Sequence, residues 1–310
     1  MNLLKMAKRT FTTIKKLNIW TKVLVIIGIL LIILMITGRE ITQVEAFTQR
    51  EKFVSKRGEA IYDEFYSDIY DYLVYDKSKN DFEIEELRRI IKRRGELLDV
   101  GCGVGHHVKL FNKEGYKAEG LDKSKWMIEK AKEKYPDCKF KNGDVIESIT
   151  YPNNKFTTIT CLYFTIYYIK DKKSMLRNCF DWLKPGGYFV LHLVNRDKFD
   201  PILNVADPLH LVSAQKYSKE RLTKSLVKFK DFQYKANFDL DKSKNQATFE
   251  ETLTDEASKN IRQNTHILHM DTQKNILSMA KETGFILKGK IDMVSAQYQY
   301  QYLYILYKPS

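Results

Sequence analysis

Three glycines at alternate positions follow a short apolar run and mark the place where we expect ligand chemistry. The run ends at Val100, and the glycines are Gly101, Gly103 and Gly105. A helix-compatible segment, residues 106–115, comes directly after them. Glycine is needed at such a turn because a side chain would block the close approach of a ligand to the backbone. The pattern predicts a buried parallel strand, a tight turn and the N-terminus of a helix.

An acid closes the second apolar run, residues 116–122. Asp122 lies 21 residues after Gly101. A nucleotide-binding sheet places there the carboxylate that accepts hydrogen bonds from ribose hydroxyls. A dinucleotide fingerprint also requires a third glycine three positions after the second, and this sequence has His106 there. The pattern therefore indicates a ligand with a ribose but does not meet the pyrophosphate motif.

Residues 99–105, with the sequence DVGCGVG, resemble the first motif of the class I methyltransferases that use S-adenosylmethionine. The rest of that family's pattern follows in order. Residues 121–136 resemble the ribose-acid segment, residues 139–145 the third strand with its acid, and residues 181–193 the helix, turn and fifth strand. The resemblance covers roughly residues 60–310. It implies an S-adenosylmethionine-dependent methyltransferase.

The resemblance also implies how this chain holds its cofactor. It places Asp99 on the amino group of the methionine half, Asp122 on both ribose hydroxyls and Asp144 on the adenine amino group. The glycine turn passes against the methionine half, and Trp126 and Met127 pack on adenine. The full set of expected cofactor contacts is Asp99, Gly101, Cys102, Gly103, Gly105, Asp122, Lys123, Met127, Asp144 and Val145.

The methyl group and its acceptor should meet just after the fourth strand. Methyl transfer is an in-line displacement at a sulfonium methyl, so the protein mainly positions and desolvates the reactants. Many relatives carry an acid at the start of this strand, where this sequence has Thr157 and Thr158. A mechanism that relies on that acid is therefore in doubt. The catalytic candidates are Tyr163, Tyr167 and His192, the other possible bases are His210, His266 and His269, and Asn195 and Arg196 are candidates for substrate contact.

Strand and helix patterns alternate from residue 96 to residue 194, which predicts a parallel sheet with helices on both faces. Residues 285–307 hold two apolar runs in close succession and predict a final antiparallel hairpin. The expected fold class is α/β. It is the family's Rossmann-like sheet of seven mostly parallel strands, with an antiparallel last strand.

An insertion of residues 195–270 interrupts that pattern. Apolar residues alternate in residues 232–240, and weaker alternation recurs in residues 246–254 and 261–270. We interpret the insertion as three antiparallel strands that form a lid over the substrate pocket.

Two amphipathic segments precede the glycine turn. Residues 60–76 carry tyrosines at helical spacing, which either pack on the core or cap the cofactor. Residues 82–95 predict a helix with a basic C-terminal end. The tyrosines are Tyr62, Tyr66 and Tyr70, and the residues expected to face inward on the second helix are Ile84, Leu87, Ile90 and Ile91.

The N-terminus carries sixteen uncharged residues between Lys22 and Arg39. They span about 24 Å as a helix, against a hydrocarbon core of ~30 Å, and Trp20 can extend the span. We favour a membrane anchor over a signal peptide or a mitochondrial leader. The expected organisation is a basic tail (1–19), a transmembrane helix (20–38), a juxtamembrane linker or helix (39–58) and a methyltransferase domain (59–310).

Charge and cysteines bear on partners and compartment. The net charge of +13 lacks a dense basic block, so we favour a lysine-rich solvated surface over a nucleic-acid partner. The four cysteines lack metal-ligand spacing and indicate reduced core thiols; no metal site is expected. The positive-inside rule places the N-terminus in the cytosol, which would put the domain across the membrane. The supply of the cofactor and the reduced cysteines instead favour a methyltransferase domain on the cytosolic face of the membrane.

The leading hypothesis is thus a single-pass, membrane-anchored methyltransferase acting on a small or lipid-like molecule. A protein or RNA methyltransferase is the second hypothesis and predicts an open groove. A catalytically silent membrane or virion component is the third. The six intact motif residues argue against it: Asp99, Gly101, Gly103, Gly105, Asp122 and Asp144.

Overall fold

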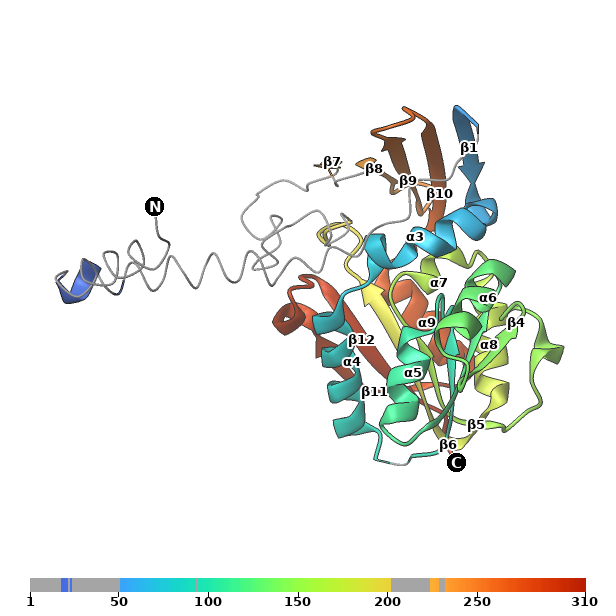
Figure 1. Cartoon of the computed structure of the whole chain (residues 1–310). Coiled ribbons are helices and arrows are strands. Elements are labelled where there is room, and N and C mark those ends of the chain that lie inside the picture. Colours follow the sequence, from blue (N-terminus) through green and yellow to red (C-terminus); the bar gives the residue numbers. More distant parts are fainter. Residues whose placement is uncertain (1–17, 22, 24–50, 93, 202–223, 229–231) are drawn as a thin grey trace, which may run out of the picture. The chain divides into compact units, whose positions relative to one another are not determined.

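The computed structural model describes residues 18–21, 23, 51–92, 94–201, 224–228 and 232–310 (Figure 1). The chain divides into two compact units, Met1–Ala46 and Phe47–Ser310. All the strands described below, and the candidate site, belong to the second unit.

A seven-stranded sheet forms the centre of this unit, in the order β11-β12-β6-β5-β2-β3-β4. Strands β2 to β6 pair in parallel, whereas β12 runs antiparallel to both β6 and β11. The predicted fold class and the antiparallel last strand are confirmed. The bounds are β2 Glu96–Val100, β3 Lys117–Asp122, β4 Lys139–Asn142, β5 Phe156–Cys161, β6 Leu183–Val194, β11 Ile286–Asp292 and β12 Gln301–Tyr307.

Helices cover both faces of the sheet because successive strand residues point to opposite sides. Leu97 packs in a cluster with Leu87 of α4 and Phe111 of α5. Its neighbour Leu98 packs in a second cluster with Leu176 of α8 and helix α9. The bounds are η1 Gly58–Ile61, α3 Glu64–Val74, α4 Lys77–Ile90, α5 His106–Lys113, α6 Lys125–Lys134, α7 Thr165–Tyr168, α8 Lys172–Trp182 and α9 Gln273–Thr283.

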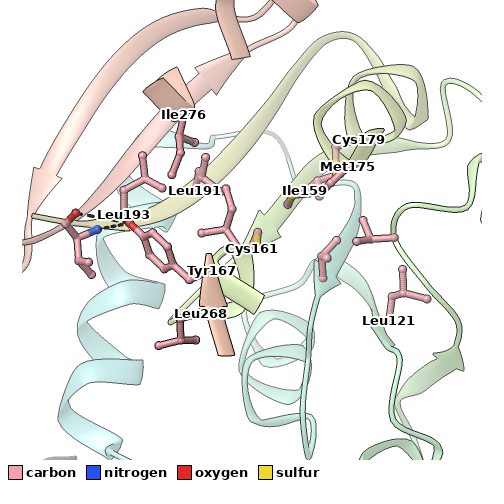
Figure 2. Close-up of a cluster of buried hydrophobic side chains, with 14 of the residues drawn as sticks. Leu121, Ile159, Cys161, Tyr167, Met175, Cys179, Leu191, Leu193, Leu268 and Ile276 are labelled. Carbon is pink, nitrogen blue, oxygen red and sulfur yellow. Dashed lines mark hydrogen bonds between the residues drawn. The ribbon is translucent and has the colours of Figure 1, made fainter. Parts of the chain in front are cut away.

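Figure 2 shows part of the second cluster, where Ile159 of β5 and Leu191 of β6 meet Met175 of α8. Tyr167 lies in this apolar layer and is fully buried. Its hydroxyl accepts a 2.9 Å hydrogen bond from the backbone N–H of Val194. The short helix α7 is thereby fastened to the end of β6.

A second, five-stranded sheet has the order β1-β10-β9-β8-β7. Strands β8 to β10 are the three antiparallel strands predicted for the insertion, and their alternation puts every second side chain in the interior. Their bounds are β8 Phe232–Asp241, β9 Gln246–Asp255 and β10 Ile261–His269, and β7 is Lys224–Lys228.

Strand β1, Phe53–Arg57, corrects one prediction. Residues 39–58 were expected to be a linker or a helix, but β1 pairs in parallel with β10 across the whole of its length. The chain before the methyltransferase motifs therefore completes the second sheet. The prediction for α4 is also corrected in two respects: the helix starts earlier, at Lys77, and Ile90 is 39% exposed rather than inward.

The predicted transmembrane helix falls mostly outside the described residues, which include Trp20, Thr21 and Val23 of residues 20–38. Within the part of the chain that is described, no helix has the length and apolar character needed to cross a membrane.

Candidate active site

A cavity of about 1070 Å³ opens at the carboxyl ends of the parallel strands. Its walls come from the turn after β2, the turn after β3 and the segment after β5, together with η1, α3 and strands β8 to β10 of the second sheet. The strand order reverses at β2, which has β3 on one side and β5 on the other. Ligands of open α/β sheets bind at such a switch point.

The glycine turn has the backbone that its sequence predicts. Gly101, Gly103 and Gly105 have φ values of +69°, +52° and +88°. Gly101 and Gly103 line the cavity, but Gly105 does not. A Cβ at Gly105 would lie 2.6 Å from the ring of Phe140, so this glycine lets α5 begin against β4. Its predicted cofactor contact is therefore not seen on the cavity wall.

Asp122 faces the cavity from the end of β3. Its Oδ2 accepts a 2.9 Å hydrogen bond from the N–H of Gly103, and its Oδ1 accepts one of 2.9 Å from the N–H of Ser124. Burial raises the pKa of this carboxyl, and the backbone donors oppose the rise. Since a carboxylate has about four lone-pair sites, both oxygens retain capacity for two ribose hydroxyls.

Asp99 lies at the end of β2, is 3% exposed and also lines the cavity. Its Oδ1 accepts a 2.7 Å hydrogen bond from Thr160. Burial raises the pKa of Asp99 to about 6, and the nearby His107 and the hydrogen bond from Thr160 offset only part of that rise. A cationic ligand would offset the remainder, as the ammonium of a methionine moiety does.

The adenine end of the predicted site is also assembled. Asp144 lines the cavity, and its Oδ2 lies 2.8 Å from Lys123 Nζ. Met127 and Val145 are buried at the same wall, and Trp126 lies beside them with Lys125 over its indole ring. These features fit S-adenosylmethionine. Two carboxylates are available to a ribose and an ammonium, the glycine turn has no side chains, and an apolar slot can hold the adenine.

A family model described as "Methyltransferase domain" matches residues 72–287, more than half of the chain. The chain belongs to this family. Its enzyme class is that of the S-adenosylmethionine-dependent methyltransferases of class I, and S-adenosylmethionine is the cofactor.

Two named relatives each match less than half of the chain. The chain is 32% identical over 141 residues to dTDP-4-amino-2,3,4,6-tetradeoxy-D-glucose N,N-dimethyltransferase of Saccharopolyspora spinosa, covering 43% of this chain and 55% of that protein. It is 29% identical over 123 residues to the ubiquinone biosynthesis O-methyltransferase of Coxiella burnetii, covering 38% and 52%. The chain thus spans about half the length of each relative.

A solved structure agrees over most of the fold. It is an S-adenosylmethionine-dependent methyltransferase from Clostridium acetobutylicum, with a TM-score of 0.60 and 17% sequence identity, covering 79% of this chain and 98% of that one.

The tyrosines that follow η1 or belong to α3 are part of the cavity wall. Tyr62, Tyr66 and Tyr70 line the cavity, and Tyr66 is also buried at 3% exposure. A Cβ at Gly103 would lie 3.4 Å from the ring of Tyr70, so this ring covers the glycine turn closely. The segment before the first motif therefore forms part of the cavity roof.

The three catalytic candidates separate in the structure. Tyr163 lines the cavity, with its backbone in the left-handed region at a φ of +54°. Tyr167 and His192 do not line it, and both are fully buried. Tyr167 is bonded to the backbone of Val194, as described above. These two positions correct our expectation that the residues meet the acceptor.

His192 belongs to a buried polar network under the cavity. Its Nε2 lies 3.1 Å from Gln301 Oε1, and its Nδ1 lies 3.9 Å from Oε1 of Glu83. Glu83 also accepts hydrogen bonds from Lys79 and His107, at 2.9 and 2.8 Å. Burial lowers the pKa of His192 to about 4, so the imidazole is neutral at physiological pH.

The other candidates for substrate contact or for a general base differ in whether they line the cavity. Arg196 donates to the carbonyl of Met270 and to Asn245, so it joins β6 to the second sheet rather than lining the cavity. Asn195 does not line the cavity either. His269 does line it, and His210 lies outside the described residues.

Sequence reasoning missed an acid that the second sheet brings to the cavity. Glu251 of β9 is fully buried, lines the cavity and contacts His266 of β10. A signal was present: in the alternating pattern of β9, Glu251 occupies an inward position between Phe249 and Leu253. A charge on the apolar face of a strand is a candidate functional residue because its burial needs partners.

Proposed function

We propose that this methyltransferase transfers a methyl group from S-adenosylmethionine to a small molecule enclosed beneath the second sheet. One observation supports the proposal most: the same cavity is walled by Asp99 and Asp122 on one side and by Glu251 and His266 on the other. A cofactor at the glycine turn would therefore have its reactive end facing strands that the core fold does not need.

The protein's own contribution is binding, alignment and exclusion of water. Asp99 and Asp122 anchor the two polar parts of the cofactor, which supplies the sulfonium methyl and its leaving group when bound. Tyr163 and the aromatic roof over the glycine turn surround the space beyond. Exclusion of water raises the reactivity of the nucleophile, because its hydration shell is removed.

Several features support a small acceptor. The two relatives named above are, by name, an N,N-dimethyltransferase of a dTDP-amino sugar and an O-methyltransferase of ubiquinone biosynthesis. A protein or RNA substrate would require an open groove, whereas α3 and strands β8 to β10 add walls to this cavity. The burial of Asp99 and Glu251 costs folding free energy, and a catalytically silent role gives no reason for the chain to keep these acids.

We also propose that residues 20–38 attach the enzyme to a membrane, which would suit a lipid-like acceptor. The support is the uncharged run between Lys22 and Arg39. Full-length protein should stay in the pellet after alkaline carbonate extraction. A variant with Leu30→Lys and Ile33→Lys should be released, because each charge at a helix centre costs about 2.5–3.5 kcal/mol. Release of the unaltered chain would contradict the attachment.

The test of the acceptor class uses labelled S-adenosylmethionine and three sets of acceptors: small amines and phenols, a lipid extract, and RNA with protein. The proposal expects label in one of the first two sets and its loss in Asp99→Asn. Asp137→Asn, an exposed acid after α6, is the matched control. Label confined to RNA or protein would overturn the proposal, as would S-adenosylmethionine binding without any methyl transfer.

A further inference from the structure

Glu251 is the centre of a hydrogen-bond cluster at the acceptor side of the cavity. Its Oε1 accepts from the hydroxyl of Tyr234 at 2.7 Å. Its Oε2 accepts from the hydroxyl of Tyr66 at 3.1 Å and from Nδ2 of Asn264 at 3.3 Å, and it lies 2.7 Å from Nε2 of His266. Burial raises the pKa of Glu251, but His266 and these donors outweigh it and hold the pKa below its ordinary value.

The ionised carboxylate fixes the protons of its neighbours. A carboxylate only accepts, so Nε2 of His266 carries the proton of their 2.7 Å hydrogen bond. With the imidazole in its neutral form, Nδ1 is then the acceptor, and the hydroxyl of Tyr168 lies 3.0 Å from this atom. In this tautomer Tyr168 donates to His266, and His266 donates to Glu251.

The chain of three groups begins at the cavity wall, since Tyr168, His266 and Glu251 all line the cavity. Tyr168 follows β5 and comes from the core fold, whereas His266 and Glu251 come from the second sheet. Burial raises the pKa of Tyr168, and a hydrogen bond with Tyr62 opposes that rise. The arrangement resembles the acid–histidine–hydroxyl alignment by which enzymes accept a proton through a hydroxyl.

Aromatic rings surround His266, and the nearest cation is already paired. Tyr62 and Tyr66 pack against its ring, with centroids 6.1 and 6.0 Å away, and Tyr168 does so at 5.9 Å. Arg262, on the same strand, is paired with Asp63 and donates to Asn264, so its charge is compensated. The acceptor end of the cavity thus presents tyrosine rings and one buried carboxylate.

We propose that Tyr168, His266 and Glu251 form the base that deprotonates an acceptor amine in this cavity. The inference rests on the proposed function and names its acceptor class. Aromatic faces and a carboxylate attract an ammonium ion, which is the form of a free amine at neutral pH. Tyr62, Tyr66, Tyr70 and Tyr163 all line the same cavity.

The proton and electron balance is complete with these groups. The ammonium of the acceptor gives one proton to the oxygen of Tyr168 while the Tyr168 proton moves to Nδ1 of His266, and Glu251 stabilises the imidazolium. The freed nitrogen lone pair forms the new N–C bond to the methyl. When bound, S-adenosylmethionine would supply this methyl group and take the electron pair of its C–S bond back on sulfur as a neutral thioether. The proton on His266 then returns through Tyr168 to water as the methylated ammonium departs.

The first experiment measures amine recognition without turnover. Tetramethylammonium chloride is titrated into the full chain saturated with S-adenosylhomocysteine, and the heat of binding is measured by calorimetry. The unaltered chain should bind, and Glu251→Gln should weaken binding at least fivefold. Glu250→Gln is the matched control because its side chain lies on the opposite face of β9. Absence of binding by the unaltered chain, or equal loss in both variants, would overturn the inference.

The second experiment tests the proposed base by the pH dependence of kcat. With ethanolamine, glucosamine and n-butylamine as acceptors, Tyr168→Phe should lower kcat at least tenfold at pH 7 and regain rate as the pH rises, since solvent then supplies the free amine. Tyr188→Phe, on β6 outside the cavity, should keep the original profile. An unchanged profile in Tyr168→Phe would overturn the relay.

The third readout guards against misfolding and separates the two proposals. Nitrogen-15 spectra of histidine should place the proton of His266 on Nε2 and should shift in Glu251→Gln while S-adenosylmethionine binding is retained. Methylation of phenols but of no amine would overturn this inference and leave the proposed function intact. Loss of methyl transfer to every small acceptor would refute the proposed function itself.

Discussion

The backbone N–H of Gly103 donates a 2.9 Å hydrogen bond to Oδ2 of Asp122. The two segments that must hold the cofactor, the glycine turn after β2 and the acid after β3, are thereby joined to each other before any ligand arrives. Asp122 also accepts from the N–H of Ser124 at the start of α6. The carboxylate is therefore held in one orientation, with its remaining lone pairs available to the ribose.

Replacement of Asp122 by Ala should weaken S-adenosylmethionine binding at least tenfold. Two hydrogen bonds to a charged group are lost, each worth about 1.5–3 kcal/mol, and the glycine turn loses its support. Calorimetric titration measures the change in Kd. Asp137→Ala, an exposed acid on the turn after α6, should leave the Kd unaltered. An unchanged Kd in Asp122→Ala would contradict the assignment of the ribose acid.

Gly101→Ala should destabilise the fold and the cofactor site together. A Cβ at this φ of +69° costs roughly 1–2 kcal/mol, and it would lie 2.5 Å from Oγ1 of Thr165 at the start of α7. Thermal unfolding should show a lower Tm. The double variant Gly101→Ala with Thr165→Ala should recover part of the loss, since the backbone strain persists but the contact is relieved. A Tm equal to that of the unaltered chain would show that the turn tolerates a side chain.

The affinity for S-adenosylmethionine should fall as the pH drops through about 6. Burial raises the pKa of Asp99 to about 6, so below that pH its carboxyl is protonated and cannot pair with the ammonium of the ligand. Titrations at pH 7 and pH 5 should differ by about tenfold in Kd, since one pH unit below the pKa leaves about a tenth of the acid ionised. Asp99→Asn should bind weakly with no such dependence. A pH-independent Kd in the unaltered chain would contradict the pairing.

His192 should affect stability and not cofactor binding. Its pKa of about 4 lies below the ordinary value of 6.5, so the unfolded chain takes up the proton first. The stability that the neutral imidazole contributes is present above pH 6.5 and is lost as the pH falls toward 4, by up to about 3 kcal/mol. Urea unfolding of His192→Gln should show a weaker decline over this range. Lost turnover with an unchanged unfolding profile would instead make His192 a catalytic residue.

The core fold could be predicted because it depends on local patterns. The glycine turn, the acids that end β2 and β3 and the alternation of β8 to β10 each specify a backbone over a few residues, and all were found where the sequence placed them. The parallel pairing of β1 with β10 could not be foreseen, because it joins residues 53–57 to residues 261–265. Five residues of mixed polarity carry no signal for a partner so distant in the chain.

The acceptor side was harder to predict than the cofactor side for the same reason. Asp99 and Asp122 lie at the carboxyl ends of strands that are neighbours in the sheet, so their proximity was implied by the motifs. Glu251, His266 and Tyr168 come from three different elements, and only the packing of the second sheet on α7 brings them together. His192 was overrated because a histidine at the end of a strand resembles a site residue, although here it is bonded within the interior.

The measurement that tests the central claim most directly is a calorimetric titration of the full chain with S-adenosylmethionine at pH 7.5, followed by competition with S-adenosylhomocysteine. We predict one molecule bound per chain, displacement by the thioether product, and at least tenfold weaker binding in Asp122→Ala than in Asp137→Ala. No heat of binding from a folded chain, or equal affinity in the two variants, would contradict the claim that this cavity is a methyltransferase cofactor site.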